Sequence, residues 1–493
     1  MDNKNLIEQA SFDVCEKEPL ANSGLIQANG ALLFIDKKSG EITFGSENVG
    51  DWLGEDLHDL LGTDGVEWLE TNIPDAPSLP AAAGKRVQLP NALDMGFGEL
   101  DLQVSATSGG WILEFERSNA QAVNTAVELI KPSGKTDEAF IEALQQSLVE
   151  AIARVSGYDR VMLYKFSSDW SGEVLAETVT EQEGEYLGLR FPATDIPSIA
   201  RSLYAKLPYR HIPDATTPPV QILGLAGSGE RMDLTWSDLR SVSPFHVTYL
   251  NNMSVRSSFS VSIMLEGRLW GLIACHHHDA LEIPLSARVR CKELADEYVQ
   301  SLAAYRTSIQ RNLYERVNDA LAPLEQNGSE PGLDLLTTRL PHLCELLDTS
   351  SAALVVDGSV LGATPSVDTE GLLRLHDWCL HNTTGEVVFI DNLPVMMKEN
   401  LPQNTAGVMA LNFRAKQHGN AAAAVYLLRP EETTEIAWAG NQDQLQEAAA
   451  SGQLSPRSSF EKWIEVRRGY SRAWDENTHF TGAQVREKLA NVL

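Results

Sequence analysis

Between Leu239 and His278, polar side chains that could bind a ligand interrupt strongly apolar runs. Four of them could hold carboxylates: Arg240, Arg256, Ser258 and Ser260. His246 and His276 could hydrogen-bond nitrogens and carbonyls of the ligand, and the rings of Phe245, Tyr249 and Phe259 could surround it. A mostly apolar site with a few convergent polar groups suits a large, flat, acidic cofactor. Taken singly, each residue is more simply explained as part of a solvated face or a satisfied core.

The elements that must position these groups are a helix and a hairpin. The pattern predicts a helix over 246–253, after the Ser243-Pro244 turn, and strands over 258–265 and 269–276. A turn at Glu266-Gly267 joins two largely apolar runs, which is typical of a hairpin in the core of a sheet. The three consecutive histidines after Cys275 do not predict a zinc site, because neighbouring strand residues point to opposite faces.

Upstream, a helix predicted over 139–157 ends at Gly157 and leads to a strand over 158–166 that contains Tyr164. The run from Tyr186 to Pro197 then places Asp195 in a loop between two prolines, which exclude a strand. A loop Asp is most often a turn former. The alternative is that its carbonyl faces a ligand.

Cys15 lies in a polar segment before the first predicted strand. A lone cysteine of this kind usually has no role, yet a reachable thiol on an irregular arm is also what covalent attachment requires. The other cysteines, at 275, 291, 344 and 379, are widely spaced, and the chain has no CxxC motif. This usage predicts reduced thiols in a cytoplasmic protein.

Composition excludes several classes of protein. With 493 residues, several domains are expected, and a net charge of −29 argues against nucleic acid or an anionic membrane as the main partner. No apolar run approaches the roughly 18 residues that cross a bilayer. The sequence contains no HExxH, GxSxG or P-loop motif, so an enzyme such as a metal-dependent hydrolase is not expected.

The motifs together resemble the photosensory module of bacterial phytochromes. These are a Cys before Glu-Pro and the segment from Gly24 to Leu33, the FPATDIP loop, the SPFH block and the CHH that ends the hairpin. Where the family usually has Pro-His, this chain has Ala28-Asn29. The resemblance implies an α+β fold of three domains (PAS, GAF and PHY) with central antiparallel sheets, long connecting helices and an N-terminal figure-of-eight knot.

The resemblance also implies biliverdin as the cofactor, joined by a thioether to Cys15. Arg210 and Arg240 would hold one propionate, and Ser258, Ser260 and His246 the other. The Asp195 carbonyl would receive pyrrole N–H groups, and His276 would contact the D-ring carbonyl. The ring that rotates would be surrounded by Tyr164, Tyr186, Phe191 and Tyr249. The remaining expected cofactor-binding residues are Ile196, Tyr204 and Met253.

We predict four parts of the chain. They are the N-terminal segment and PAS domain at 1–120, the GAF domain at 121–312, the PHY domain at 313–480 and the start of a coiled-coil linker at 481–493. A helical pattern over 286–324 suggests a connector or dimer contact. The excursion at 429–470 is too long for a hairpin turn and resembles the PHY tongue. Its expected signalling residues are Arg457, which would pair with Asp195, and Trp438, Phe460 and Trp463.

The expected function is red/far-red photoreception by D-ring isomerisation, relayed through the tongue and dimer helices. The chain itself is not expected to be an enzyme; a histidine kinase or diguanylate cyclase in cis would supply the output. A parallel homodimer is expected, with no nucleic acid and no membrane as partner. The alternative is a dark GAF-type receptor for a small ligand such as a cyclic nucleotide.

Overall fold

The computed structural model describes residues 20–96, 98–118, 126–131, 137–180, 184–225, 232–326, 332–397, 404–441 and 459–493. Cys15 and Arg457 therefore lie outside the described residues. The chain forms two compact units: residues 1–302 with 437–463, and residues 303–436 with 464–493. The three-domain α+β architecture with antiparallel sheets is confirmed.

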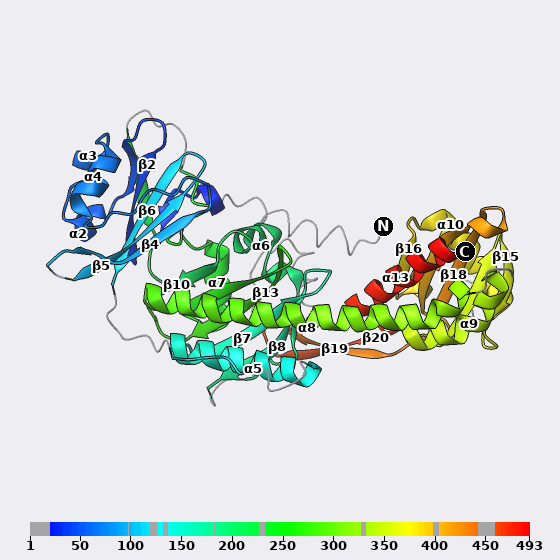
Figure 1. The fold of residues 1–493 in the computed structure, drawn as a ribbon. Helices are drawn as coiled ribbons and strands as arrows, with labels where there is room; N and C mark the ends of the chain where they lie inside the picture. Colours follow the sequence, from blue (N-terminus) through cyan, green and yellow to red (C-terminus); the bar gives the residue numbers. More distant parts are fainter. Residues whose placement is uncertain are drawn as a thin grey trace. The chain divides into compact units, whose positions relative to one another are not determined.

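The N-terminal part of the first unit is built on a seven-stranded sheet in the order β1-β11-β3-β2-β6-β5-β4. Helices α2 (Val49–Leu53), α3 (Leu57–Leu60) and α4 (Gly65–Asn72) cover one of its faces, where their apolar residues share a core with the strands (Figure 1). The strands are β1 (Leu25–Ile26), β2 (Gly30–Asp36), β3 (Ile42–Ser46), β4 (Arg86–Asp94), β5 (Glu99–Ala106), β6 (Gly110–Arg117) and β11 (Val220–Gly224).

Strands β4 and β11, like the two-residue β1, were not predicted from the sequence. In β4, the register shifts between Leu89 and Leu93, and Asn91 has a φ of 52°. This bulge follows Pro90 and breaks the alternation by which a strand is recognised. The other, β11, lies among prolines and far along the chain from the sheet that it joins.

The segment before β2 lies between two later parts of the chain. Leu25 pairs with Gln221, while Ile26 forms an isolated bridge to Arg240. On the same segment, the backbone N–H of Leu234 donates to the Ala21 carbonyl at 2.7 Å. The N-terminal segment is thus bracketed by both ends of one loop. Because residues 226–231 of that loop are not described, the knot stays a prediction.

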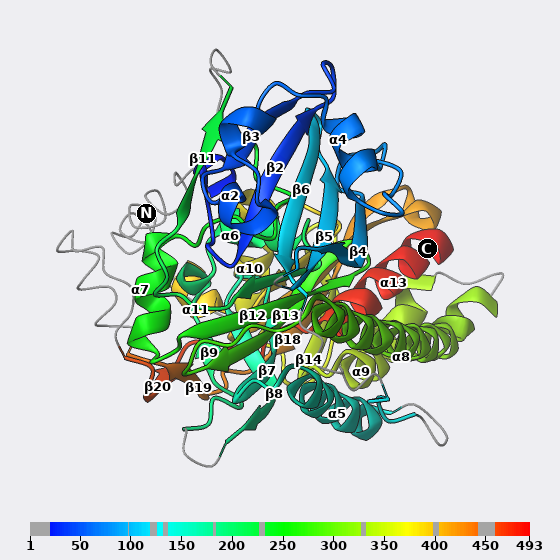
Figure 2. The same cartoon turned by 90° about the vertical axis from the view of Figure 1, so that its left-hand side faces the viewer.

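The second sheet has eight strands in the order β10-β12-β13-β7-β8-β9-β19-β20 (Figure 2). From β10 to β9, neighbouring strands are antiparallel, whereas β9 and β19 pair in parallel through Arg190 and Trp438. The strands are β7 (Arg160–Phe166), β8 (Gly172–Val179), β9 (Arg190–Phe191), β10 (Tyr209–Ile212), β12 (Ser257–Leu265), β13 (Arg268–His277), β19 (Thr434–Ala439) and β20 (Lys462–Arg467).

The predicted hairpin is confirmed as β12 and β13. Glu266 and Gly267 form its two-residue turn with φ values of 53° and 76°, the left-handed pair that suits the twist of a hairpin. The register pairs Ser258 with His276 and Ser260 with both Arg210 and Ala274. Directly opposed side chains share a face, so strand pairing alone brings these polar groups together.

Helices cover both faces of this sheet. Helix α5 (Glu138–Ser156) lies on one side, while α6 (Ser198–Tyr204) and α7 (Pro244–Asn252) lie on the other (Figure 1). As predicted, α5 ends at Gly157, whose φ of 76° makes it a left-handed cap. The long helix predicted over 286–324 is α8 (Leu285–Gln326), and the division between the two units falls within it.

Two predictions about this sheet need correction. Strand β8 was not foreseen, because Gly172 at its start and the polar alternation of GEVLAETV give little apolar signal. The loop around Asp195 is not wholly irregular: Ala193–Asp195 forms one turn of 3₁₀ helix, η2. Pro192 is its extended N-cap and Ile196 its C-cap, and Pro197 directly afterwards is the extended N-cap of α6.

The second unit contains a five-stranded sheet, β15-β14-β18-β17-β16, with an apolar core on each face. Its strands are β14 (Ser351–Val356), β15 (Ser359–Ala363), β16 (Val387–Ile390), β17 (Gly407–Ala415) and β18 (Ala421–Arg429). Its helices are α9 (Gly332–Leu347), α10 (Thr369–Asn382), α11 (Leu393–Met397) and α13 (Glu476–Val492). The C-terminal helix begins five residues before the predicted start at 481, capped by Asp475, and Val485 and Leu489 lie in the core. Among the described residues, no helix is long and apolar enough to cross a membrane.

Candidate functional site: a cavity between a sheet face and two helices

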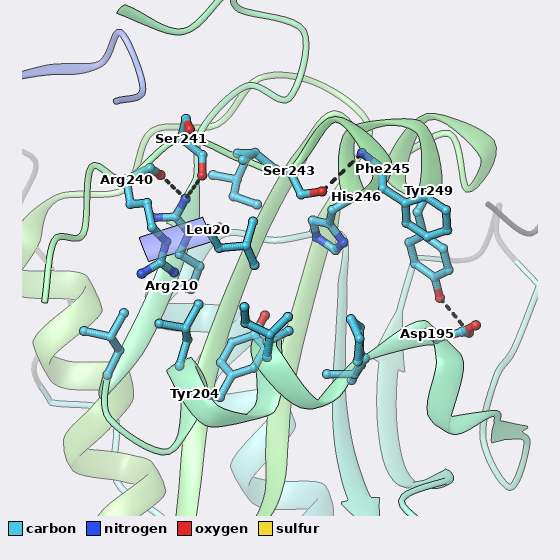
Figure 3. A pocket seen from close by; sticks show the side chains of 18 residues that line it. Leu20, Asp195, Tyr204, Arg210, Arg240, Ser241, Ser243, Phe245, His246 and Tyr249 are labelled. Atoms are coloured by element: carbon cyan, nitrogen blue, oxygen red, sulfur yellow. Dashed lines mark hydrogen bonds between the residues drawn. The ribbon is translucent and has the colours of Figure 1, made fainter. Parts of the chain in front are cut away.

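A cavity of the first unit, partly open to solvent, lies beside α6 and α7 and holds about 940 Å³ of space including its solvent-filled mouth (Figure 3). Eight residues singled out from the sequence line it: Asp195, Ile196, Tyr204, Arg210, Arg240, Phe245, His246 and Tyr249. In Figure 3, Arg210 and Arg240 lie at one end, Tyr249 and Asp195 at the other, and His246 between them. The cavity therefore has a basic end and an acidic end.

Two arginines form the basic end. The Arg210 guanidinium donates to the backbone carbonyls of Asp238 at 2.6 Å and Ser241 at 3.3 Å, and also to that of Arg240. Arg240 makes longer contacts, 3.3 and 3.5 Å, to the carbonyls of Leu234 and Thr235. Burial, and after it the charge of Arg210, lowers the pKa of Arg240 to about 9. Both guanidiniums stay charged at pH 7, so this end favours an anion.

The imidazole of His246 occupies the middle of the cavity wall and stacks on Tyr249, with ring centroids 5.9 Å apart. Burial, and then the charge of Arg210, lowers the pKa of His246 to about 4. A neutral imidazole offers one donor and one acceptor nitrogen. At pH 7, therefore, His246 can both donate to and accept from a ligand.

At the acidic end, the Tyr249 hydroxyl donates to the Asp195 carboxylate at 3.1 Å. The ring of Phe460 packs edge-on against Tyr249, with centroids 5.4 Å apart. Asp195 comes from the 3₁₀ turn, Tyr249 from α7 and Phe460 from the excursion predicted as a tongue. Three segments far apart in the sequence thus meet around one carboxylate.

Further aromatic residues form a continuous edge-to-face row on the same side of the sheet. Successive centroids are 5.6, 5.2, 6.0 and 5.7 Å apart along the row Trp170, Phe166, Tyr164, Phe191 and Tyr186. The guanidinium of Arg160 lies 4.2 Å from the Tyr186 ring and is buried in an ion pair with Glu177. Of the predicted aromatic residues, Tyr164, Tyr186 and Phe191 therefore belong to one packed cluster, although none of the three lines the cavity.

His276 lies on the face of the sheet that carries this cluster, paired across the strands with Ser258 and Arg160. Its Nδ1 atom is buried and has no hydrogen-bond partner among the described residues. Burial, and then the charge of Arg160, lowers the pKa of His276 to about 3. A buried neutral imidazole with an unused nitrogen is poised to bond a ligand group.

The remaining sequence-predicted residues lie around the cavity rather than in its lining. Ser258 and Ser260 are buried on β12, and the Tyr204 hydroxyl donates to Ser260 Oγ at 3.4 Å. Met253 is the C-terminal cap of α7. Arg256 is elsewhere: it binds Asp214 through two hydrogen bonds of 3.0 and 2.7 Å and remains 45% exposed. Arg256 thus holds a carboxylate of its own chain.

Sequence reasoning missed much of the apolar lining. Ile199, Leu203 and Leu207 face the cavity from α6 and the turn after it, and Leu20 closes it from the N-terminal segment. The spacing of four residues from Ile199 to Leu207 is a helical signal that could have identified that face. Nothing local to Leu20 indicates its place, which depends on pairing with distant residues.

The described part of the predicted tongue also reaches this region. Trp438 is 6% exposed and pairs with Arg190, and Ala439 is buried in the cluster that contains Tyr164 and Phe191. The Gly440 N–H donates to the Glu461 carbonyl at 2.7 Å, which joins the two sides of the excursion. Trp463 lies on β20 and is partly exposed.

Three family models match the chain. A PAS fold matches residues 15–118, a GAF domain 141–304 and a phytochrome region 315–493. The model boundaries assign α13 to the phytochrome region.

Relatives along nearly the whole chain carry related names. The chain is 30% identical to cyanobacterial phytochrome B of Nostoc sp. over 98% of its length and 31% identical to a bacteriophytochrome of Pseudomonas aeruginosa over 96%. It spans 66% and 65% of the length of these relatives, slightly less than two thirds. A solved phytochrome photosensory core module from Stigmatella aurantiaca superposes with a TM-score of 0.79 at 29% identity, covering 97% of each chain.

Proposed function

The chain belongs to the phytochrome family as a PAS-GAF-PHY photosensory module, and on this premise we propose that it is a red/far-red photoreceptor that binds biliverdin covalently. The observation that carries the proposal is the cavity of the GAF domain, with two buried arginines at one end and a neutral histidine in its middle. A long, flat dicarboxylate has the complementary chemistry.

The residues present fit such a bilin. Arg240 and Arg210 would hold one propionate, since guanidinium forks match carboxylates, and Ser258 and Ser260 with His246 would hold the other. The Asp195 carbonyl would accept from pyrrole N–H groups. The unused Nδ1 of His276 supports a hydrogen bond to a ligand group on that face of the sheet, which we assign to the D-ring carbonyl. Ile196, Tyr204 and Met253 would complete the surroundings.

We assign covalent attachment to Cys15. Leu20 lines the cavity, and Cys15 precedes it by five positions, a distance of at most about 18 Å in an extended chain, so the thiol is within reach of the cavity. If the bilin were not attached to Cys15, Cys275 would be the next candidate for the attachment residue. Against this, Cys275 is fully buried, burial raises its pKa well above its usual value, and its strand register places it on the opposite face from His276.

When bound, the bilin would supply light absorption and isomerisation of the methine bridge before its D ring. The chain would hold that ring between Tyr164, Tyr186, Phe191 and Tyr249 and relay a change in their packing. Asp195 is the candidate relay, since it bonds Tyr249 and we propose that it also pairs with Arg457 of the tongue. Trp438, Phe460 and Trp463 would then exchange their packing as the tongue refolds.

The output and the partners are also proposals. We expect a parallel homodimer through the long helices and an output domain in cis, either a histidine kinase or a diguanylate cyclase. We expect the protein to act in the cytoplasm.

The proposal is tested by mixing the chain with biliverdin and recording absorption in the dark and after red and far-red light. We expect reversible difference bands, with pigment retained on the chain after denaturation. Cys15→Ala should keep reversible binding and lose the retained pigment, whereas Cys379→Ala is the matched control. No absorbance change in the wild type would overturn the proposal, and binding of a cyclic nucleotide by that same protein would favour the dark receptor.

A further inference from the structure

Trp170 has a backbone conformation that its side chain does not favour. It lies in the turn between β7 and β8 with a φ of 64°, in the left-handed region where a Cβ atom crowds the backbone. Glycine would adopt this conformation without that penalty. When a residue with a large side chain keeps a strained backbone, the contacts of that side chain are expected to offset the strain.

The indole ring of Trp170 makes two such contacts. Its edge meets Phe166, with centroids 5.6 Å apart and an interplanar angle of 67°. The guanidinium of Arg201 lies over the ring, 4.7 Å from its centroid. The indole nevertheless remains 41% exposed, so burial of the ring alone does not account for its position.

Arg201 connects this ring to the turn that carries Asp195. Its Nη1 donates to the Ile196 carbonyl at 2.5 Å and to the Ala193 carbonyl at 3.4 Å. These carbonyls flank Asp195, so one guanidinium holds the backbone on both of its sides. Arg201 itself is fixed at the start of α6, where its N–H donates to the Pro197 carbonyl at 3.0 Å.

We propose that Trp170 and Arg201 form a clamp that positions Asp195 for its contact with Tyr249. Trp170 fixes the plane of the guanidinium, and the guanidinium fixes the turn from Ala193 to Ile196. Neither residue is among the described residues that line the cavity, so both act through Asp195 as positioning residues. A role of these two residues in light sensing rests on the proposed function, whereas their effect on the position of Asp195 does not.

The chemistry of the clamp distinguishes arginine from lysine. A planar guanidinium can stack on an indole while its N–H groups donate in the ring-parallel plane. A lysine ammonium keeps the charge but cannot stack as a plane, and its nitrogen ends one bond short of Nη1, the atom that donates to both carbonyls. Arg201→Lys should therefore release the turn although the charge remains.

The first test uses the chain without bilin and measures hydrogen exchange of the amides of residues 191–203. We expect exchange to rise about threefold in Trp170→Gly, as loss of a partly exposed cation–π contact predicts, and about tenfold in Arg201→Lys. Trp170→Gly relieves the backbone strain, so a clamp without a function would leave exchange unchanged or slower. The double variant should exchange no faster than Arg201→Lys, because both changes break one device.

Arg117→Lys is the matched control, since Arg117 lies over Trp52 at 5.7 Å in the PAS domain. It should leave exchange at 191–203 unchanged. Unchanged exchange in both Trp170→Gly and Arg201→Lys would overturn the clamp. This arm gives its answer even if the wild type fails to bind biliverdin, so the two proposals can fail separately.

The second test uses the biliverdin-loaded protein and measures the photoproduct fraction under saturating red light together with retained pigment. We expect Arg201→Lys and Trp170→Gly to lower the photoproduct fraction at least twofold, with pigment retention unchanged. Trp170→Phe should give a photoproduct fraction between those of Trp170→Gly and the wild type, because a ring face remains. Faster exchange at 191–203 with a wild-type photoproduct fraction would overturn the assignment of the clamp to the photoswitching site.

Discussion

At the scale of single residues, the two arginines of the cavity have different hydrogen-bond partners. The Arg210 guanidinium donates to three backbone carbonyls in the segment from Asp238 to Ser241. Arg240 makes two longer contacts. Because short charged hydrogen bonds hold a segment more firmly than long ones, Arg210 organises the wall and Arg240 has more freedom to turn toward an anion.

Arg210→Lys should destabilise the chain without bilin by about 2 kcal/mol, since buried charged hydrogen bonds to carbonyls are lost and an ammonium cannot reach all three. Urea unfolding measures this. Arg256→Lys is the matched control: its pair with Asp214 is 45% exposed, and its effect should be clearly smaller. An equal effect of the two variants would contradict the structural role of Arg210.

The histidines of the site predict a pH dependence of stability. An unfolded histidine takes up a proton near pH 6.5, whereas the folded His246 does so near pH 4, because burial disfavours its charged form. As the pH falls from 6.5 to 4, the unfolded state therefore binds more protons and the fold loses stability, about 3 kcal/mol for this residue. His246→Asn should flatten this loss in urea unfolding at a series of pH values. A slope that is unchanged in the variant would refute the assignment.

At the scale of elements, strand β8 shapes the aromatic cluster through the side chain that it lacks. Gly172 faces Tyr164, and a Cβ atom at this position would lie 1.7 Å from Tyr164 Cζ. Its φ is not in the left-handed region, so the glycine is needed for the tyrosine ring and not for the backbone. A glycine at the start of a strand therefore determines where the ring of Tyr164 lies in the aromatic cluster.

Gly172→Ala should displace the Tyr164 ring from its edge contacts with Phe166 and Phe191 and cost about 1–3 kcal/mol, the usual range for overpacking. Gly184→Ala is the matched control, since a Cβ atom there meets nothing within 4 Å. Thermal unfolding measures the cost, and a crystal structure of the variant locates the ring. An unmoved Tyr164 would be the contrary outcome.

At the scale of the whole molecule, the first unit is held together by a buried carboxylate that crosses from one domain to the next. Glu114 on β6 of the PAS domain accepts from the Ser237 hydroxyl at 2.6 Å and from the N–H groups of Leu239 at 2.8 Å and Asp238 at 3.2 Å. Ser237 Oγ in turn accepts from the Arg240 N–H at 2.9 Å. The PAS domain thereby helps to place the arginines of the GAF cavity.

Glu114→Ala should cost about 2 kcal/mol or more, because it leaves buried donors of the segment from Ser237 to Leu239 without an acceptor. It should also weaken biliverdin binding in the Cys15→Ala background, where binding is reversible and can be titrated. Glu128→Ala, at an exposed glutamate, is the control for both measurements. Unchanged affinity with reduced stability would mean that the PAS carboxylate does not act on the cavity.

Several local elements and the family could be predicted from short stretches of the sequence. The β12–β13 hairpin, α5 with its Gly157 cap and the long α8 were all predictable, since periodicity and turn residues act over a few positions. The motifs around Asp195, His246 and His276 indicated a cofactor site for the same reason: each is a short, contiguous run of residues.

The contacts between segments that lie far apart in the chain followed only from the tertiary structure. Strand pairing placed Arg210, Ser260 and His276 on one face and Cys275 on the other, and the joining of β11 to a distant sheet brought Leu20 to the cavity. The clamp of Trp170 and Arg201 likewise joins residues 31 positions apart. Such contacts depend on register and packing between segments remote in the chain, and no local pattern encodes them.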